Sequence, residues 1–212
     1  MINLLLNLVF EKEIGSSIVK EIKERVSPDH FYMVVGDTKE LSIFEKLGDC
    51  ILRDNAYRGI YDDRLELEEN IPIDDSLLQF MNQHSLEIMH QQRRFEHYPV
   101  EEVDESWNSH YTIYMHNLFF WYNFLIKKQI THVFLSLIPH EGYDITIYYL
   151  CRYLNIQLQM VHSSIIPFRR FPLKDILDIE PVIKEEYETL LAKYKESDIS
   201  DIPLEGKTIE VF

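Results

Sequence analysis

The stretch that decides the fold is 131–162, which reads THVFLSLIPHEGYDITIYYLCRYLNIQLQMVH. It opens with an apolar run at 133–138 and closes with a second apolar run at 158–161. Between them lie a short polar segment, 139–144, and an amphipathic pattern at helical spacing. This order predicts a strand, a loop, a helix and a second strand, the unit from which parallel sheets are built.

The first quarter of the chain shows the same alternation. Three apolar runs read as strands, at 2–10, 31–35 and 50–52, and helical patterns at 15–26 and 38–47 separate them. The order βαβαβ implies a parallel sheet with right-handed crossovers. We therefore predict an α/β fold, a Rossmann-like three-layer sandwich with a mainly parallel sheet of about five to six strands.

Residues 53–130 are expected to form a mostly helical insertion between the third and fourth strands. The part at 53–73 reads as a long loop in which a helical turn is an alternative. Residues 74–94 read as one helix capped by the polar run that begins at Asp74. The part at 107–129 is apolar on most faces, which is typical of a buried helix. Its aromatic residues favour core packing over an aromatic cofactor box.

The C-terminal part predicts a loop at 163–174 and a helix at 175–195 that is broken or restarted near Pro181. The last residues, 207–212, alternate like a strand. A chain seldom stops on its own apolar strand, so we expect 1–212 to be a single Rossmann-like domain at the N-terminus of a longer protein. The alternative is a C-terminal edge strand that docks on the sheet.

Composition narrows the function classes. A formal net charge of −15 disfavours a general nucleic-acid binder and docking to anionic lipid. No apolar run approaches the ~18 residues that span a bilayer, and the N-terminus lacks the basic region of a signal peptide. Cys50 and Cys151 lie far apart without metal-ligand spacing, as expected of reduced core residues. We therefore expect a cytoplasmic protein with no transmembrane segment and no metal site.

Several sequence motifs of enzymes are missing. The chain contains no GxGxxG after its first strand and no P-loop, GxSxG, HExxH or CxxC motif. Dinucleotide oxidoreductases, P-loop ATPases, α/β-hydrolases and zinc proteases are therefore disfavoured. With 6 glycines in the chain, loops that cradle phosphate through backbone N–H groups are scarce.

Polar residues follow the predicted strands instead. They are Gly36 and Asp37 after the second, Arg53 after the third, His140, Glu141 and Asp144 after the fourth, and His162 after the fifth. The carboxyl ends of parallel strands share one edge, so we expect these groups to converge on a substrate-binding cleft. Glu141 or His140 is the candidate general base toward a sugar hydroxyl. Arg169 or its neighbour Arg170 is a candidate partner for a phosphate or carboxylate.

Each candidate also has a purely structural alternative. Asp144 is a suitable cap for a helix that begins at Ile145, and Glu141 at a helix N-terminus gains from the helix dipole. The ring of His140 is able to hydrogen-bond loop backbone, and His162 is able to sit in the core. Gly36 and Asp37 together read as an ordinary strand-to-helix turn.

Three segments carry a resemblance to a known family: FYMVVGD at 31–37, PHEGYD at 139–144 and IYYLCRYLNI at 147–156. With them the chain, from its first strand to about Asp175, resembles the N-terminal domain of bacterial capsular or surface polysaccharide biosynthesis proteins. Those proteins look like glycosyltransferases with two Rossmann-like halves that face a cleft. The resemblance implies an acceptor-side half, a small-molecule or glycan substrate, a nucleotide-sugar donor with no other cofactor, and a C-terminal donor-binding domain.

Two other functions stay open at this point. One is a non-catalytic binding or scaffold module for a sugar phosphate or a protein partner, in which the loop at 139–144 is purely structural. The weaker one is a small cytosolic α/β hydrolase of a phosphorylated metabolite. A second βαβ-rich half after Phe212 would favour the transferase over the binding module.

Overall fold

The structure is a computed structural model that describes residues 1–7, 12–36, 38–59, 71–94, 106–163 and 170–194. The first half contains β1 (Asn3–Asn7), α1 (Lys12–Val26), β2 (His30–Val35), α2 (Thr38–Phe44), β3 (Asp49–Leu52), α3 (Arg53–Arg58), α4 (Asp75–Asn82) and α5 (Ser85–Arg94). The second half contains α6 (Trp107–Lys127), β4 (His132–Leu135), α7 (Gly142–Leu154), β5 (Gln157–Ser163), β6 (Arg170–Leu173), the 3-10 turn η2 (Ile176–Asp178) and α8 (Ile179–Tyr194).

The strands form one six-stranded sheet in the order β3-β2-β1-β4-β5-β6. Neighbours pair in parallel throughout, except that β6 runs antiparallel to β5. This confirms the predicted α/β fold with a mostly parallel sheet. The chain builds the sheet outward from β1 in one direction and then in the other, so the order reverses between β1 and β4. That reversal is the position where open α/β sheets bind ligands, at the carboxyl ends of the strands.

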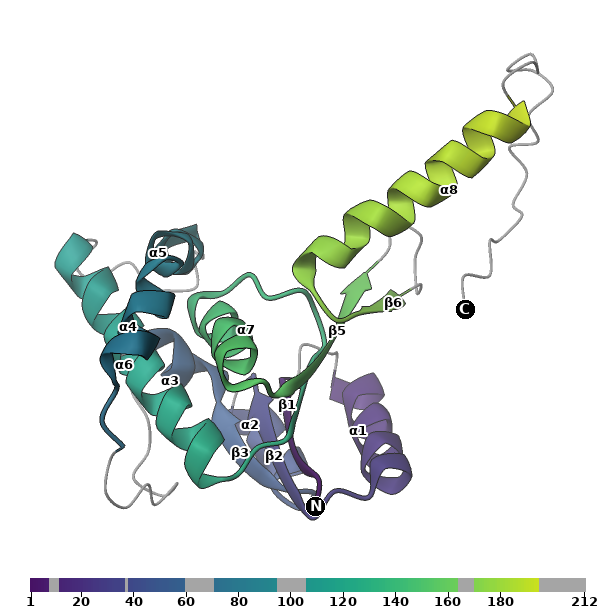
Figure 1. Ribbon diagram of the computed structural model, residues 1–212. Coiled ribbons are helices and arrows are strands. Elements are labelled where there is room, and N and C mark those ends of the chain that lie inside the picture. Colours follow the sequence, from purple (N-terminus) through teal and green to yellow (C-terminus); the bar gives the residue numbers. More distant parts are fainter. Residues whose placement is uncertain (8–11, 37, 60–70, 95–105, 164–169, 195–212) are drawn as a thin grey trace.

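Helices cover both faces of the sheet, which gives three layers (Figure 1). Side chains of a strand alternate between faces, and β1 shows this directly. Leu4 and Leu6 pack in the cluster that contains Val19 of α1 and Phe44 of α2. Leu5 packs on the opposite side, in the larger cluster formed with α3 to α7. Because β1 is buried on both faces, its centre reads as three consecutive leucines, Leu4 to Leu6.

The helical insertion differs from the prediction in two places. The helix expected at 74–94 is two helices, because the N–H groups of Gln83 and His84 bond back three residues to Phe80 and Met81 and close a tight turn. Its predicted cap is confirmed: Asp74 accepts from the backbone N–H of Leu77 at 2.7 Å.

The segment predicted as a long loop, with a helical turn as the alternative, begins with a helix, α3, directly after β3. Burial of Ala56 and Tyr57 against the sheet layer fixes this helix. Gly59 ends it in the left-handed conformation, with φ of 63°.

The C-terminal part also differs from the prediction. The segment predicted as a loop, 163–174, contains β6, which is the edge strand of the sheet. Proline has no N–H to donate, and an edge strand tolerates Pro172 because one side of it has no neighbouring strand to bond. From there η2 leads into α8, which extends away from the sheet (Figure 1). The strand predicted at 207–212 lies outside the described residues.

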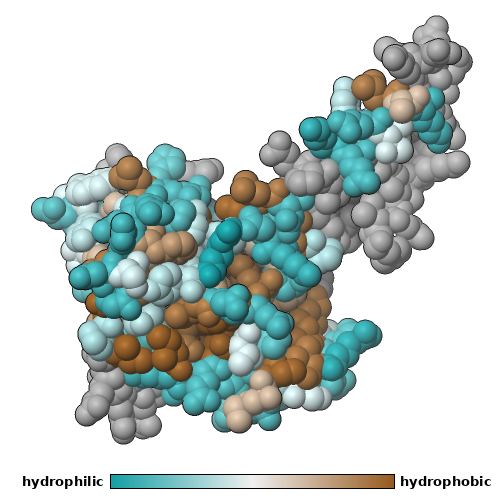
Figure 2. Space-filling view, in the orientation of Figure 1, coloured by the Kyte–Doolittle hydropathy of each residue, from teal (hydrophilic) through white to brown (hydrophobic). Residues whose placement is uncertain are grey.

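Part of the sheet is thinly covered. The space-filling view shows hydrophobic residues across the middle of the molecule, around β4 and β5 (Figure 2). Phe134, Leu158 and Val161 of these strands are half-buried.

Within the described part of the chain, none of the helices combines the length and the apolar character that a membrane span requires.

Candidate functional site

The carboxyl edge of the sheet at the β1–β4 switch point gathers a cluster of polar side chains. Its members are Asn7 at the end of β1, Tyr57 on α3, Glu141 just before α7, and Tyr143 and Asp144 in the first turn of α7. We call these five residues the acidic cluster. All five are less than a tenth exposed. Such burial of polar groups requires hydrogen bonds among them, and those bonds define the geometry of the site.

The start of α7 follows from its own polar residues. Glu141 has extended backbone, with φ of −110° and ψ of 154°, and stands directly before Gly142, the first helical residue. Asp144 accepts from the N–H of Glu141 at 2.7 Å and from the N–H of His140 at 3.1 and 3.2 Å. The prediction that Asp144 precedes a helix starting at Ile145 was therefore wrong in register. The helix begins at Gly142. The carboxylate of Asp144, in its first turn, accepts the backbone N–H groups of the two residues that precede the helix.

The side chain of Glu141 faces the backbone N–H of Asp144 in a reciprocal capping box, and one of its two oxygens accepts from a tyrosine. The hydroxyl of Tyr57 donates to Oε1 at 2.5 Å. The second oxygen, Oε2, is buried and has no hydrogen-bond partner in the described part of the chain. Since a buried carboxylate oxygen normally finds a donor, Oε2 is the atom of the site that a ligand group or a water would complete.

The two tyrosines of the cluster are proton donors at neutral pH. Burial, and next the nearby charge of Glu141, raise the pKa of Tyr57 and of Tyr143. The hydroxyl of Tyr143 donates to Oδ1 of Asn7 at 3.0 Å and so ties the start of α7 to the end of β1.

Arg53 brings a positive charge to the same edge. A methyl group placed on Gly36 would lie 3.1 Å from Nη2 of Arg53 and 2.6 Å from Oε2 of Glu40. The N–H of Gly36 donates to that Glu40 oxygen at 2.6 Å. The guanidinium charge reaches Tyr57 and Tyr143, where it opposes the rise in pKa. Gly36 and Arg53 therefore meet at this edge of the sheet, beside the acidic cluster.

The remaining predicted residues are not part of the cluster. Nδ1 of His140 lies 2.7 Å from the carbonyl of Ile138, which only accepts, so Nδ1 carries the proton and the ring is tied to the loop backbone. His162 was predicted to follow β5, but it lies within that strand and pairs with Phe171 of β6. Because β4 lies between β5 and β1, His162 is separated by one strand from Asn7 of the cluster. Asp37 and Arg169 lie outside the described residues.

The raised pKa of Asp144 predicts how the free energy of unfolding depends on pH. Burial, and next the charge of Glu141, raise the pKa of Asp144 well above its ordinary value of 3.8. The native state then binds a proton that the unfolded state releases, so stability is greatest below the unfolded pKa and falls as pH rises toward the folded pKa. We expect Asp144→Asn to remove this fall, so that its free energy of unfolding improves relative to wild type between pH 4 and 8.

Urea denaturation across that pH range measures the effect. Asp75→Asn, at an exposed position in the first turn of α4, is the matched control. If the stability difference between Asp144→Asn and wild type is the same at every pH, the carboxyl of Asp144 does not take up a proton on folding.

Sequence reasoning missed three members of the cluster, Asn7, Tyr57 and Tyr143. Asn7 had a usable signal, because a polar residue interrupts the apolar run of the first strand where the sheet edge falls. Tyr143 lies inside the 139–144 loop that was singled out, but only His140, Glu141 and Asp144 of that loop were named as candidates. Tyr57 had no signal, since it falls in the stretch read as a loop.

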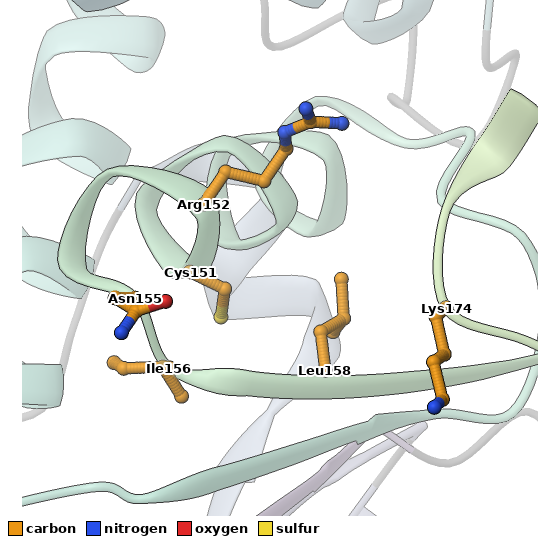
Figure 3. Close-up of a pocket in the computed structure, with 6 residues that line it drawn as sticks. All are labelled: Cys151, Arg152, Asn155, Ile156, Leu158 and Lys174. Atoms are coloured by element: carbon orange, nitrogen blue, oxygen red, sulfur yellow. The ribbon is translucent and has the colours of Figure 1, made fainter.

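A separate pocket lies at the other end of α7 (Figure 3). It has a volume of about 330 Å³ and is lined by Cys151, Arg152, Asn155, Ile156, Leu158 and Lys174. Asp144 of the acidic cluster and Cys151 of this pocket are seven residues apart on α7, which is about 10 Å along the helix at 1.5 Å per residue. In the close-up, the guanidinium of Arg152 points away from the cavity, and this group pairs with Asp175.

The described residues contain no group of three or more His, Cys, Asp or Glu side chains placed to hold a metal ion. Comparison of the chain with protein-family models, with curated proteins and with solved structures finds no match. Fold and geometry thus define the class: a Rossmann-like α/β domain with a buried acidic cluster at the switch point of its sheet.

Proposed function

We propose that this chain is the acceptor-side domain of a glycosyltransferase that acts in bacterial surface or capsular polysaccharide biosynthesis. The observation that supports it most is Glu141, whose Oε2 is buried without a described hydrogen-bond partner at the carboxyl edge of the sheet. A carboxylate held in this way is suited to accept a proton from a sugar hydroxyl.

In the proposed reaction, Oε2 of Glu141 takes the proton of an acceptor hydroxyl while the hydroxyl oxygen attacks the anomeric carbon of the donor. The new glycosidic bond forms as the bond to the nucleotide breaks, and the nucleotide leaves with the electron pair. Tyr57 fixes the carboxylate through Oε1. Burial, and next the charge of Glu141, raise the pKa of Asp144, which disfavours a second negative charge beside Glu141.

The donor is assigned to a second, C-terminal domain. The chain has no glycine-rich phosphate motif, and its 6 glycines leave little scope for a backbone phosphate cradle. Arg53, beside the cluster, is a candidate contact for the departing nucleotide phosphate across the cleft between the domains. His140 positions the loop through its ring and backbone rather than exchanging protons with substrate.

One observation favours a second candidate, a non-catalytic module that binds a sugar phosphate. Glu141 and Asp144 both make hydrogen bonds that build the start of α7, and Glu141 is only 5% exposed. In that case Arg53 contacts the phosphate and the cluster contacts the sugar, without turnover.

The test is glycosyl transfer by the full-length protein. It is incubated with a panel of nucleotide sugars and oligosaccharide acceptors, and products are detected by mass spectrometry. Nucleotide release that depends on acceptor, with a product heavier by one sugar, supports the transferase. Binding of sugar phosphates by calorimetry without any transfer supports the binding module instead.

A further inference from the structure

The helix α8 stands away from the body of the domain (Figure 1). Its 16 residues span about 24 Å at 1.5 Å per residue. Among the described elements it packs mainly with η2, the short turn that leads into it. Isolated helices of this length are marginal in water, because most helix stability in proteins comes from packing of an amphipathic face. We therefore expect α8 to have a packing partner beyond the described body of the domain.

The junction at the base of α8 fixes the direction of the helix. Oδ2 of Asp178 accepts from the backbone N–H of Lys174 at 3.0 Å and from that of Asp175 at 2.8 Å. The side chain of Asp175 forms an ion pair with Arg152 near the end of α7. These bonds tie η2 both to the end of β6 and to α7. Folding α8 back onto its own sheet would require breaking them.

One face of α8 presents large apolar side chains to solvent. Tyr187 is 62% exposed and Leu191 is 52% exposed. Positions four apart lie on the same face of a helix, so these two side chains are neighbours. Lys184 and Glu188, both exposed, each precede one of them by three positions and therefore line one side of the pair. We call these four residues the α8 patch.

The α8 patch is complementary to a second copy of itself. In an antiparallel pair of α8 helices related by a two-fold axis near Tyr187, the apolar side chains of both copies meet at the centre. Lys184 of each copy then lies toward Glu188 of the other copy. A parallel pair would instead place Lys184 opposite Lys184 and Glu188 opposite Glu188, which is unfavourable. The antiparallel contact is also closed, as is usual for dimers of identical chains.

We infer that α8 is a dimerisation helix: two copies of this chain pair antiparallel through the α8 patch and bury Tyr187 and Leu191 at the contact. Because α8 projects, the two domains stay apart, which limits repulsion between copies that each carry a net charge of −15. Dimerisation of this kind makes no use of the acidic cluster, so it does not depend on the proposed transfer reaction.

Sedimentation equilibrium of the chain 1–212 measures the dissociation constant of the dimer. Low ionic strength is used because salt screens exposed charge pairs. The wild-type protein is expected to dimerise with a dissociation constant in the micromolar range. Tyr187→Asp and Leu191→Asp are each expected to raise that constant at least about 30-fold, as for a central interface residue. Glu185→Lys is the matched control, since it changes an exposed charge away from the patch and should leave the constant nearly unchanged.

Exchange of the two charges tests the arrangement of the helices. Lys184→Glu and Glu188→Lys each place like charges at both symmetric contacts, so each is expected to weaken the dimer about tenfold or more. A mixture of the two variants restores opposite charges at both contacts, and its heterodimer should form about as tightly as the wild-type dimer. The double variant Lys184→Glu/Glu188→Lys should recover in the same way. Mixing cannot rescue a variant that fails to fold, so the mixture separates contact from stability.

Three outcomes overturn the inference. If the wild-type protein stays monomeric at about 100 μM, α8 does not pair copies of this chain, and another segment or partner covers the patch. If the dimer persists in Tyr187→Asp and Leu191→Asp, it forms through a different surface. If the mixed charge variants bind as weakly as each variant alone, the antiparallel pairing of Lys184 with Glu188 is wrong. The glycosyl-transfer assay decides the proposed function independently of all three.

Discussion

Replacing Glu141 with glutamine is expected to lower the rate of glycosyl transfer by at least about 100-fold, the usual contribution of a general base. The amide keeps the size of the side chain, and its oxygen can still accept from the hydroxyl of Tyr57. It cannot take up the proton of an acceptor hydroxyl. The loss should therefore appear in kcat, while KM for the acceptor changes little. Initial rates at several acceptor concentrations measure both quantities.

His140→Ala is the matched control, because His140 is the neighbouring residue and the other candidate base of the same loop. Its ring bonds the carbonyl of Ile138, and its backbone N–H, which donates to Asp144, survives the substitution. We expect its kcat to stay within a few-fold of wild type. Equal turnover by wild type and Glu141→Gln would remove Glu141 from the mechanism, and a large loss in His140→Ala alone would transfer the role to the histidine. Thermal unfolding of each variant verifies that the fold is kept.

The sequence predicted the sheet well because its strands are buried on both faces. All five residues of β1 are buried, and its three central leucines make the strand easy to recognise. The helix-spaced patterns between the strands leave a parallel order as the natural solution. The edge strand β6 was missed for the opposite reason. It is four residues long and contains Pro172, and both features are typical of a loop.

The candidate site was predictable only where it is local in sequence. Glu141 and Asp144 share one loop and one helix turn, so their proximity follows from spacing. Tyr57 reaches Glu141 across 84 positions of chain, and that contact depends on how α3 packs against α7, which no local pattern encodes. His162 was misplaced because β5 extends to Ser163, two residues beyond its apolar run, to pair with β6.

The largest loss of stability is expected for Trp121→Ala. Trp121 is fully buried in α6, and its ring packs edge-on against Phe120 and Phe124, with centroids 5.0 and 5.6 Å apart. Removing a buried tryptophan side chain costs about 3–5 kcal/mol, a large share of the roughly 5–15 kcal/mol that holds a typical domain folded. Urea denaturation followed by circular dichroism measures this difference without relying on tryptophan fluorescence.

Trp107→Ala separates burial from residue type. Trp107 starts the same helix but is 58% exposed, so its removal is expected to change the free energy of unfolding by no more than about 0.5 kcal/mol. Trp121→Phe keeps an aromatic ring against Tyr143 and should lose less than Trp121→Ala. Equal losses in Trp107→Ala and Trp121→Ala would contradict the packing of α6 against α7. Because Tyr143 also bonds Asn7, that packing holds the start of α7, and with it Glu141, at the end of β1.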